Sequence, residues 1–310
     1  GARQDEGQVG LGGRGGQHQV GARAEGASCA GRRDADGLGV RAAEELGREA
    51  FAKLTDSLGP DDQRTLSVGC TLASALAGLG RAEAATALFA DLAGRARRVL
   101  GPEHTDTLLI LSRMATQLAV DLHRPEDARP LQEEVLAGRR KVLGTAHPET
   151  LLAAANLAWT LNALGEHDAA LKLIEPTYER QRRQLGEQHP STLAARNCLA
   201  VIYADVGDLE RAVALQERMV ADSEQAAGER HPYTLAALTN LGRITYEMGA
   251  LTRSREALLK AHEGYAATVG HDNVTALNAA AWLVGTLDAE GDKRAAEIAA
   301  EMLPVARRTL

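Results

Sequence analysis

The segment LGTAHPETL, Leu143–Leu151, is one of six related copies along the chain. The other five read LGPDDQRTL (58–66), LGPEHTDTL (100–108), LGEQHPSTL (185–193), AGERHPYTL (227–235) and VGHDNVTAL (269–277). Their glycines are 42, 43, 42, 42 and 42 residues apart, at Gly59, Gly101, Gly144, Gly186, Gly228 and Gly270. A fixed period of this length is typical of a repeat protein in which each unit is one supersecondary element.

A second glycine divides each unit. It follows the glycine of the copied segment by 21 residues, at Gly80, Gly165, Gly207, Gly249 and Gly291. In the second unit His123 takes this place after 22 residues, which accounts for the single spacing of 43. Glycine readily adopts the left-handed conformation that closes a helix, so two glycines per unit predict two helices. In the third unit, Leu and Ala recur at helical spacing over about 149–164 and 166–185.

The copied segment itself is expected to be the turn between consecutive helix pairs. Its glycine stops one helix, and its His-Pro step disfavours helical geometry at the residue before the proline. The proline then fixes φ near the start of the next helix, and the leucine begins the next buried stripe. Each helix pair can bury its apolar face only against its neighbours, so the period predicts a solenoid.

Composition agrees with an all-α fold. The chain is 45% hydrophobic, but only 3% of its residues are aromatic, so Leu and Ala supply most of the apolar surface. Both residues are strong helix formers. Residues that favour strands never gather into alternating runs.

Residues 1–38 differ from the rest. The stretch GQVGLGGRGGQHQVG, Gly7–Gly21, is rich in glycine, polar and without periodicity, so we expect the segment to be disordered. The repeat array is expected over 39–310. It divides into a half-repeat at 39–58 and six repeats at 59–100, 101–143, 144–185, 186–227, 228–269 and 270–310.

The repeated pattern H-P-x-T-L…N-L-A…L-G-x-x-x-x-A resembles the tetratricopeptide repeat, in the 42-residue form of kinesin light chains and bacterial adaptor-like proteins. Three units carry it most clearly: HPETLLAAANLAWTLNALGEHDAA (147–170), HPSTLAARNCLAVIYADVGDLERA (189–212) and HPYTLAALTNLGRITYEMG (231–249). The resemblance implies a right-handed α-solenoid of antiparallel helix pairs, the tetratricopeptide superhelix. It also implies small residues where paired helices cross, at Ala73, Ala115, Ala158, Ala200 and Gly242, and at Ala85, Ala128, Ala170, Ala212 and Ala296.

Charge and cysteine content narrow the possible functions. The formal net charge is −7 and the pI is about 5.8, which disfavours a nucleic-acid partner. No apolar run of 18 residues is present, so no membrane span is expected. Cys29, Cys70 and Cys198 form no CxxC motif or disulfide framework, which favours a reducing compartment and a cytoplasmic location.

No pattern predicts catalysis, a metal or a cofactor. The recurring histidines His104, His147, His189 and His231 lie about one repeat apart, too far for one zinc ion, and are interpreted as turn residues. The match to GxGxxG at 10–15 has no strand before it and no helix after it, so it does not predict nucleotide binding. We therefore expect no enzyme activity, no metal and no cofactor.

In the tetratricopeptide family, the first helix of every pair lines a concave groove. Matching the chain to the family residue by residue places Ala194, Asn197, Val201, Ala204, Ala236, Thr239, Arg243, Tyr246, Asn278, Ala281, Gly285 and Asp288 along its second half. Trp, Tyr and Arg are the residues most enriched at binding hot spots, and Asn can both donate to and accept from a peptide backbone. The expected groove in repeats three to five is therefore formed by Trp159, Asn162, Asn197, Arg243, Tyr246, Asn156 and Asn240. In the sixth repeat, the large residues Trp282 and Val284 lie near the helix crossing. We interpret them as a sign that this terminal repeat is packed more loosely.

Three functions follow from these observations. The first is a non-catalytic scaffold that binds a protein or peptide partner in the groove of repeats three to five. The second is implied by a resemblance to the C-terminal sensor portions of bacterial signal-transducing NTPases: the chain would be the regulatory region of a larger enzyme whose catalytic domain lies outside it. The third is a purely structural or self-associating array. An upstream GxxxxGK[ST] loop would support the second, and concentration-dependent oligomers would support the third.

Overall fold

The computed structural model describes residues 37–271 and 273–309, and within these ranges the chain forms α-helices and no strand. The segment predicted to be disordered, residues 1–38, lies outside the described residues except for 37 and 38, which begin the first helix. The helices are α3 (Gly37–Leu58), α4 (Gln63–Gly78), α5 (Ala82–Val99), α6 (Thr105–Val120), α7 (Pro125–Leu143), α8 (Pro148–Ala163), α9 (His167–Leu185), α10 (Pro190–Asp205), α11 (Leu209–Ala227), α12 (Pro232–Glu247), α13 (Leu251–Thr268), α14 (Val274–Ala289) and α15 (Arg294–Thr309).

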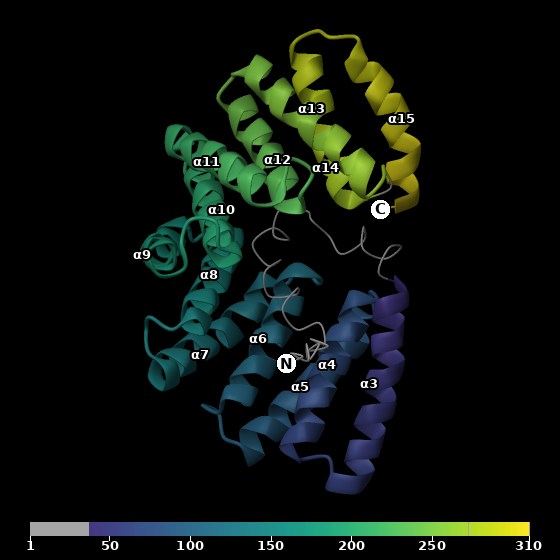
Figure 1. Ribbon diagram of the computed structural model, residues 1–310, viewed down its shortest axis with the longest axis vertical. Helices are drawn as coiled ribbons and strands as arrows, with labels where there is room; N and C mark the ends of the chain where they lie inside the picture. Colours follow the sequence, from purple (N-terminus) through teal and green to yellow (C-terminus); the bar gives the residue numbers. More distant parts are fainter. Residues whose placement is uncertain (1–36, 272, 310) are drawn as a thin grey trace, which may run out of the picture.

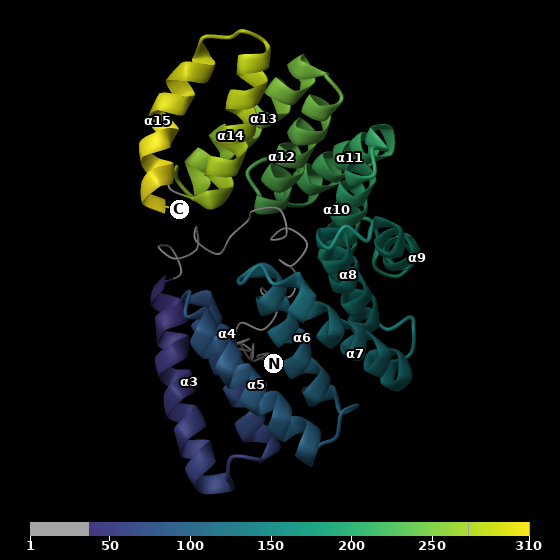
Figure 2. The same ribbon diagram turned by 180° about the vertical axis from the view of Figure 1, so that it is seen from behind.

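Each helix packs against the helices before and after it in the sequence. In addition, the first helices of successive pairs contact one another; we name α4, α6, α8, α10, α12 and α14 the inner helices and the others the outer helices. The array bends so that α3 and α15, its two ends, lie on the same side, with α9 on the outside of the bend (Figure 1, Figure 2). The prediction of an all-α solenoid of antiparallel helix pairs is confirmed. None of the described helices combines the length and the apolar character that a membrane crossing requires.

The copied segment forms the turn between pairs, and its glycine, histidine, proline and threonine each have a structural role. The glycine of the third copy, Gly144, has φ 86° and ψ 164°, a conformation that is essentially restricted to glycine. The carbonyl of Gly144 accepts a hydrogen bond from Thr150 Oγ1 at 2.8 Å. His147 caps the next helix, because its Nδ1 accepts the backbone N–H of Glu149 at 3.2 Å, and Pro148 occupies the first helical position.

The histidine cap recurs in four repeats. Nδ1 of His104, His189 and His231 also accepts the N–H of the second residue after it, at 3.1–3.3 Å. Asp62 and Asn273 cap the inner helices of the first and sixth repeats in the same way. The recurring histidines are therefore helix caps, a more specific role than the turn residues predicted from the sequence.

The mid-unit glycines close the inner helices differently. At Gly207 the chain has φ 84°, and the N–H of Asp208 donates to the carbonyl of Tyr203 at 2.8 Å, five residues back, as in a Schellman motif. His123 adopts φ 50° in the second repeat, so this position accepts a residue other than glycine. There the N–H of Arg124 reaches back six residues to Leu118, which accommodates the extra residue of that unit.

Small residues let paired helices approach closely. Ala73, Ala115, Ala158 and Ala200 are fully buried, as are their partners Ala85, Ala128, Ala170 and Ala212. A Cβ built on Gly242 would lie only 2.3 Å from Leu258 Cγ, so the fifth repeat requires glycine at this crossing. The prediction for Ala296 was wrong: α15 begins at Arg294, and its buried small residue is Ala295, whereas Ala296 is exposed.

Substitution by asparagine should distinguish the glycines of the copied segment from the mid-unit glycines. Asn is tolerated in the left-handed helical region but not at φ 86°, ψ 167°, the conformation of Gly186. We expect Gly186→Asn to lower the free energy of unfolding by about 1–3 kcal/mol and Gly207→Asn by less than about 1 kcal/mol. Urea unfolding followed by circular dichroism measures both. Equal losses would contradict the distinction.

The helix cap at His231 should weaken in acid. Burial lowers the pKa of His231 below its ordinary value, so the stability from its acceptor nitrogen is present above about pH 6.5 and is lost as the pH falls. Asparagine, the natural cap at Asn273, does not titrate. Between pH 7.5 and pH 5 we expect His231→Asn to gain about 0.5–1 kcal/mol relative to the wild type, measured by urea unfolding. If the free energy of unfolding changed equally with pH in the two proteins, the role of His231 as a titrating helix cap would be refuted.

Candidate functional site

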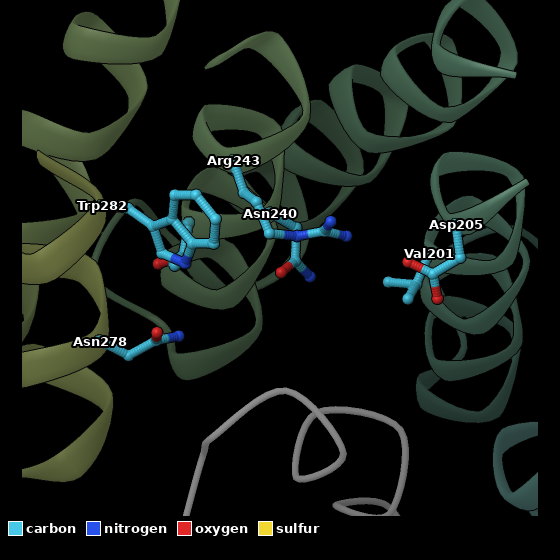
Figure 3. A pocket seen from close by; sticks show the side chains of 7 residues that line it. Val201, Asp205, Asn240, Arg243, Asn278 and Trp282 are labelled. Atoms are coloured by element: carbon cyan, nitrogen blue, oxygen red, sulfur yellow. The ribbon is translucent and has the colours of Figure 1, made fainter. Parts of the chain in front are cut away.

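A pocket of about 330 Å³ lies between three inner helices, α10, α12 and α14. Figure 3 shows the α14 side chains on one side, the α10 side chains on the other, and those of α12 between them. The lining consists of Val201 and Asp205 from α10, Thr239, Asn240 and Arg243 from α12, and Asn278 and Trp282 from α14. The pocket therefore opens on the inner side of repeats four to six.

The repeat period explains why these side chains share one face. Asn240 and Trp282 are 42 residues apart and so occupy the same position in successive inner helices. Val201 and Arg243 are equivalent in the same way. Because stacked repeats bring equivalent positions side by side, residues one period apart meet at the pocket.

Asn240 belongs to a buried amide network that joins two repeats. Its Nδ2 donates to Asn197 Oδ1 at 2.9 Å, and Gln216 Nε2 donates to the same oxygen at 2.7 Å. Asn197 is 1% exposed and Asn240 is 4% exposed. The network therefore links α10, α11 and α12 behind the pocket and fixes the orientation of the Asn240 side chain.

A second polar chain orients Asp205. Asn162 Nδ2, from α8, donates to Asp205 Oδ2 at 2.6 Å, and Asn162 Oδ1 lies 2.7 Å from His167 Nδ1. Since Asn162 uses its amide nitrogen on Asp205, its oxygen must accept, and His167 Nδ1 must carry the proton. Asn162 therefore contributes to the pocket by orienting Asp205, one of its lining residues.

Arg243 and Trp282 are each held by one neighbour. Arg243 Nη1 donates to Glu247 Oε1 at 2.8 Å, one helical turn along α12. The ring of Trp282 packs edge-on against Tyr246, with the ring centroids 5.9 Å apart. Both Arg243 and Trp282 stay partly accessible, which leaves a cation and an aromatic surface at the pocket.

The residues expected to form the groove divide into three groups. Asn240 and Arg243 line the pocket, whereas Asn162, Asn197 and Tyr246 contact residues that line it. Trp159 and Asn156 lie on α8, outside the pocket, and are 8% and 7% exposed. Their part in binding remains a prediction.

Sequence reasoning missed two lining residues, Trp282 and Asp205. Trp282 was interpreted as a sign of a looser terminal repeat. Its position, 42 residues after Asn240, was the available signal, because it places an indole at an inner-face register. Asp205 follows Ala204, the last groove position that the family pattern marks, and its role depends on a hydrogen bond from the preceding repeat.

A buried charge cluster elsewhere is structural. Arg196 is fully buried, and its guanidinium donates to Tyr178 Oη at 3.2 Å and to the carboxylates of Asp222 and Glu187. The arginine thus joins α9, α10 and α11. Its charge is fully partnered, so the cluster presents no reactive group.

The described residues contain no group of three or more His, Cys, Asp or Glu side chains placed to hold a metal. Burial raises the pKa of the Cys70 thiol to about 11, which keeps it protonated and poorly nucleophilic at neutral pH. The pocket groups can therefore bind by charge, hydrogen bonds and aromatic contact.

Family models described as tetratricopeptide repeat match residues 65–106, 110–183, 161–225 and 191–267. The last three matches together run from 110 to 267, just over half of the chain. The chain belongs to the tetratricopeptide repeat family. A comparison with proteins of curated function gives no match.

Solved structures place the tetratricopeptide array among kinesin-light-chain-like repeats. TPR-like repeats from a Podospora anserina protein described as a kinesin light chain are 28% identical, with a TM-score of 0.57, over 66% of this chain and 95% of that one. BtubC (BKLC) from P. vanneervenii is 19% identical, with a TM-score of 0.60, over 74% and 92%. NprR in complex with its cognate peptide NprX is 13% identical, with a TM-score of 0.59, over 86% and 78%. The last two share the fold with this chain.

The amide network can be tested by a double-mutant cycle on the tetratricopeptide array. Asn197→Leu leaves the donors of Asn240 and Gln216 buried without their acceptor, at about 1–3 kcal/mol for each donor. Asn240→Leu removes one of these donors, so the double variant should lose less stability than the sum of the single variants. Urea unfolding gives the three values. Additive losses would show that packing, and not the shared hydrogen bonds, joins the two repeats.

Proposed function

We propose that this chain is a non-catalytic scaffold that binds an extended segment of a protein partner along its inner helices. The groove extends the one expected in repeats three to five, and its main contact is the pocket between α10, α12 and α14. The single observation that supports the proposal is the pocket itself, which combines an aromatic ring, a cation and a carboxylate on one inner face.

The arrangement suits a chain segment better than a compact ligand. The lining residues come from three successive inner helices, so a partner that fills the pocket crosses repeat boundaries. Trp282 offers an aromatic surface, and Arg243 and Asp205 offer charges of opposite sign. Trp and Arg carry much of the binding energy at protein interfaces when they are partly desolvated.

The comparison with NprR and its peptide NprX supports this proposal at the level of fold. That structure is a solenoid of the same fold in complex with a peptide. We extend this to the present chain on the strength of its pocket. The absence of enzyme activity and the cytoplasmic location remain predictions.

The alternative, a sensor region of a larger signal-transducing NTPase, places the same groove in a regulatory role. It is tested in the coding sequence upstream of residue 1, where a GxxxxGK[ST] loop would support it. The binding proposal holds in either case, because it concerns only the inner face of the array.

Two pocket variants and one control test the proposal. We expect Arg243→Ala and Trp282→Ala each to weaken partner binding about 10-fold or more, because each removes a hot-spot side chain. Lys172→Glu, an exposed charge on the outer helix α9, should leave binding unchanged. Partners are captured from lysate, their bound segment is mapped and synthesised, and its affinity is measured by calorimetry.

Circular dichroism must show that all three variants remain folded. Retained affinity in both pocket variants, or a loss in Lys172→Glu, would place the binding surface elsewhere.

A further inference from the structure

We infer that the pocket selects a partner segment with a basic side chain, lysine or arginine, whose charge meets Asp205. The inference rests on the proposed function and adds the chemical class of the ligand. It follows from how Asp205 is held, from what its equivalent in the next repeat does, and from the charges around the pocket.

Asp205 is held in place but is not neutralised. Its Oδ2 accepts from Asn162, a neutral donor that is itself oriented by His167. Among the described residues, no Lys, Arg or His lies within ion-pair distance of its carboxylate, and Oδ1 has no donor. The side chain is exposed at the pocket wall. One carboxylate oxygen is therefore available to a cation from outside.

In the next repeat, the acid at the position equivalent to Asp205 is paired with an arginine. Glu247 lies 42 residues after Asp205 and likewise ends its inner helix. It is paired with Arg243 four residues earlier, whereas the residue four before Asp205 is Val201. The two acids thus share a register, and among the described residues Glu247 has a cationic partner whereas Asp205 has none.

Helix geometry adds to the negative potential at this point. Asp205 is the last residue of α10, so its charge adds to the partial negative charge of the carbonyls at that helix end. The carboxylate and the helix end repel each other unless a cation is close by. A basic side chain of a partner would relieve this repulsion, which gives the pocket a preference for positive charge.

The rest of the lining suits a long basic side chain. Val201 lies one turn before Asp205 and offers an apolar surface for an aliphatic stem, as lysine and arginine require. Trp282 on the opposite side offers an aromatic face that attracts cations (Figure 3). Arg243 is paired with Glu247, so its charge opposes a cation less than a free guanidinium would.

Three labelled nonapeptides, GSALXLASG with X as lysine, norleucine or glutamate, test the inference by fluorescence anisotropy on the full chain. Norleucine keeps the stem of lysine and removes its charge. We expect the lysine peptide to bind about 3- to 10-fold more tightly than the norleucine peptide, and the glutamate peptide to bind most weakly. The preference should shrink as NaCl rises, because exposed charges are screened.

Asp205→Asn should abolish the preference for lysine while the norleucine peptide binds as before. Asp168→Asn, on the outer helix α9, removes the same formal charge away from the pocket and should keep the preference. Asp205→Lys should favour the glutamate peptide. Circular dichroism checks that each variant is folded.

The outcomes separate this inference from the proposed function. If the lysine and norleucine peptides bind equally and Trp282→Ala abolishes the binding of both, the charge preference is overturned and the proposed binding groove is supported. A lysine preference that survives in Asp205→Asn would overturn the role of Asp205. Binding of none of the three peptides at millimolar concentration would count against both proposals.

Discussion

The structure depends on the turn that joins consecutive helix pairs. Its glycine adopts a conformation closed to other residues, its threonine hydroxyl bonds back to the glycine carbonyl, and its histidine caps the next helix. These local bonds fix where one outer helix ends and the next inner helix begins. The turn recurs six times, with Asp62 and Asn273 in place of the histidine in the first and sixth repeats. Since neighbouring helix pairs pack on one another, these turns set the course of the described array.

This turn also explains why the fold was predictable from the sequence and the pocket only partly so. Gly144, Pro148 and the leucine stripe of each inner helix obey local rules, which act within a few residues and leave a visible period. The resemblance to the tetratricopeptide family then placed Arg243 and Asn278 on the inner face. Even Ala296 was misplaced by one residue only, since the small residue that α15 buries is its neighbour Ala295.

The pocket residues that were missed depend on contacts between repeats. Asp205 is defined by a hydrogen bond from Asn162, 43 residues earlier. Trp159 and Trp282 look alike in sequence, yet the first is buried on α8 and the second lines the pocket. Helical spacing puts both tryptophans on inner helices, but it does not give their surroundings, which come from other units.

Polar residues on the inner face therefore serve two purposes, and burial separates them. Asn240 donates a hydrogen bond to Asn197 and so holds α12 against α10, which keeps the inner helices in register. Asp205 and Arg243 stand at the same surface but remain accessible. In a solenoid the first group must be satisfied internally, because a buried unpaired amide would destabilise the stack. The second group is free to vary from repeat to repeat, and this freedom lets one regular backbone carry a specific site.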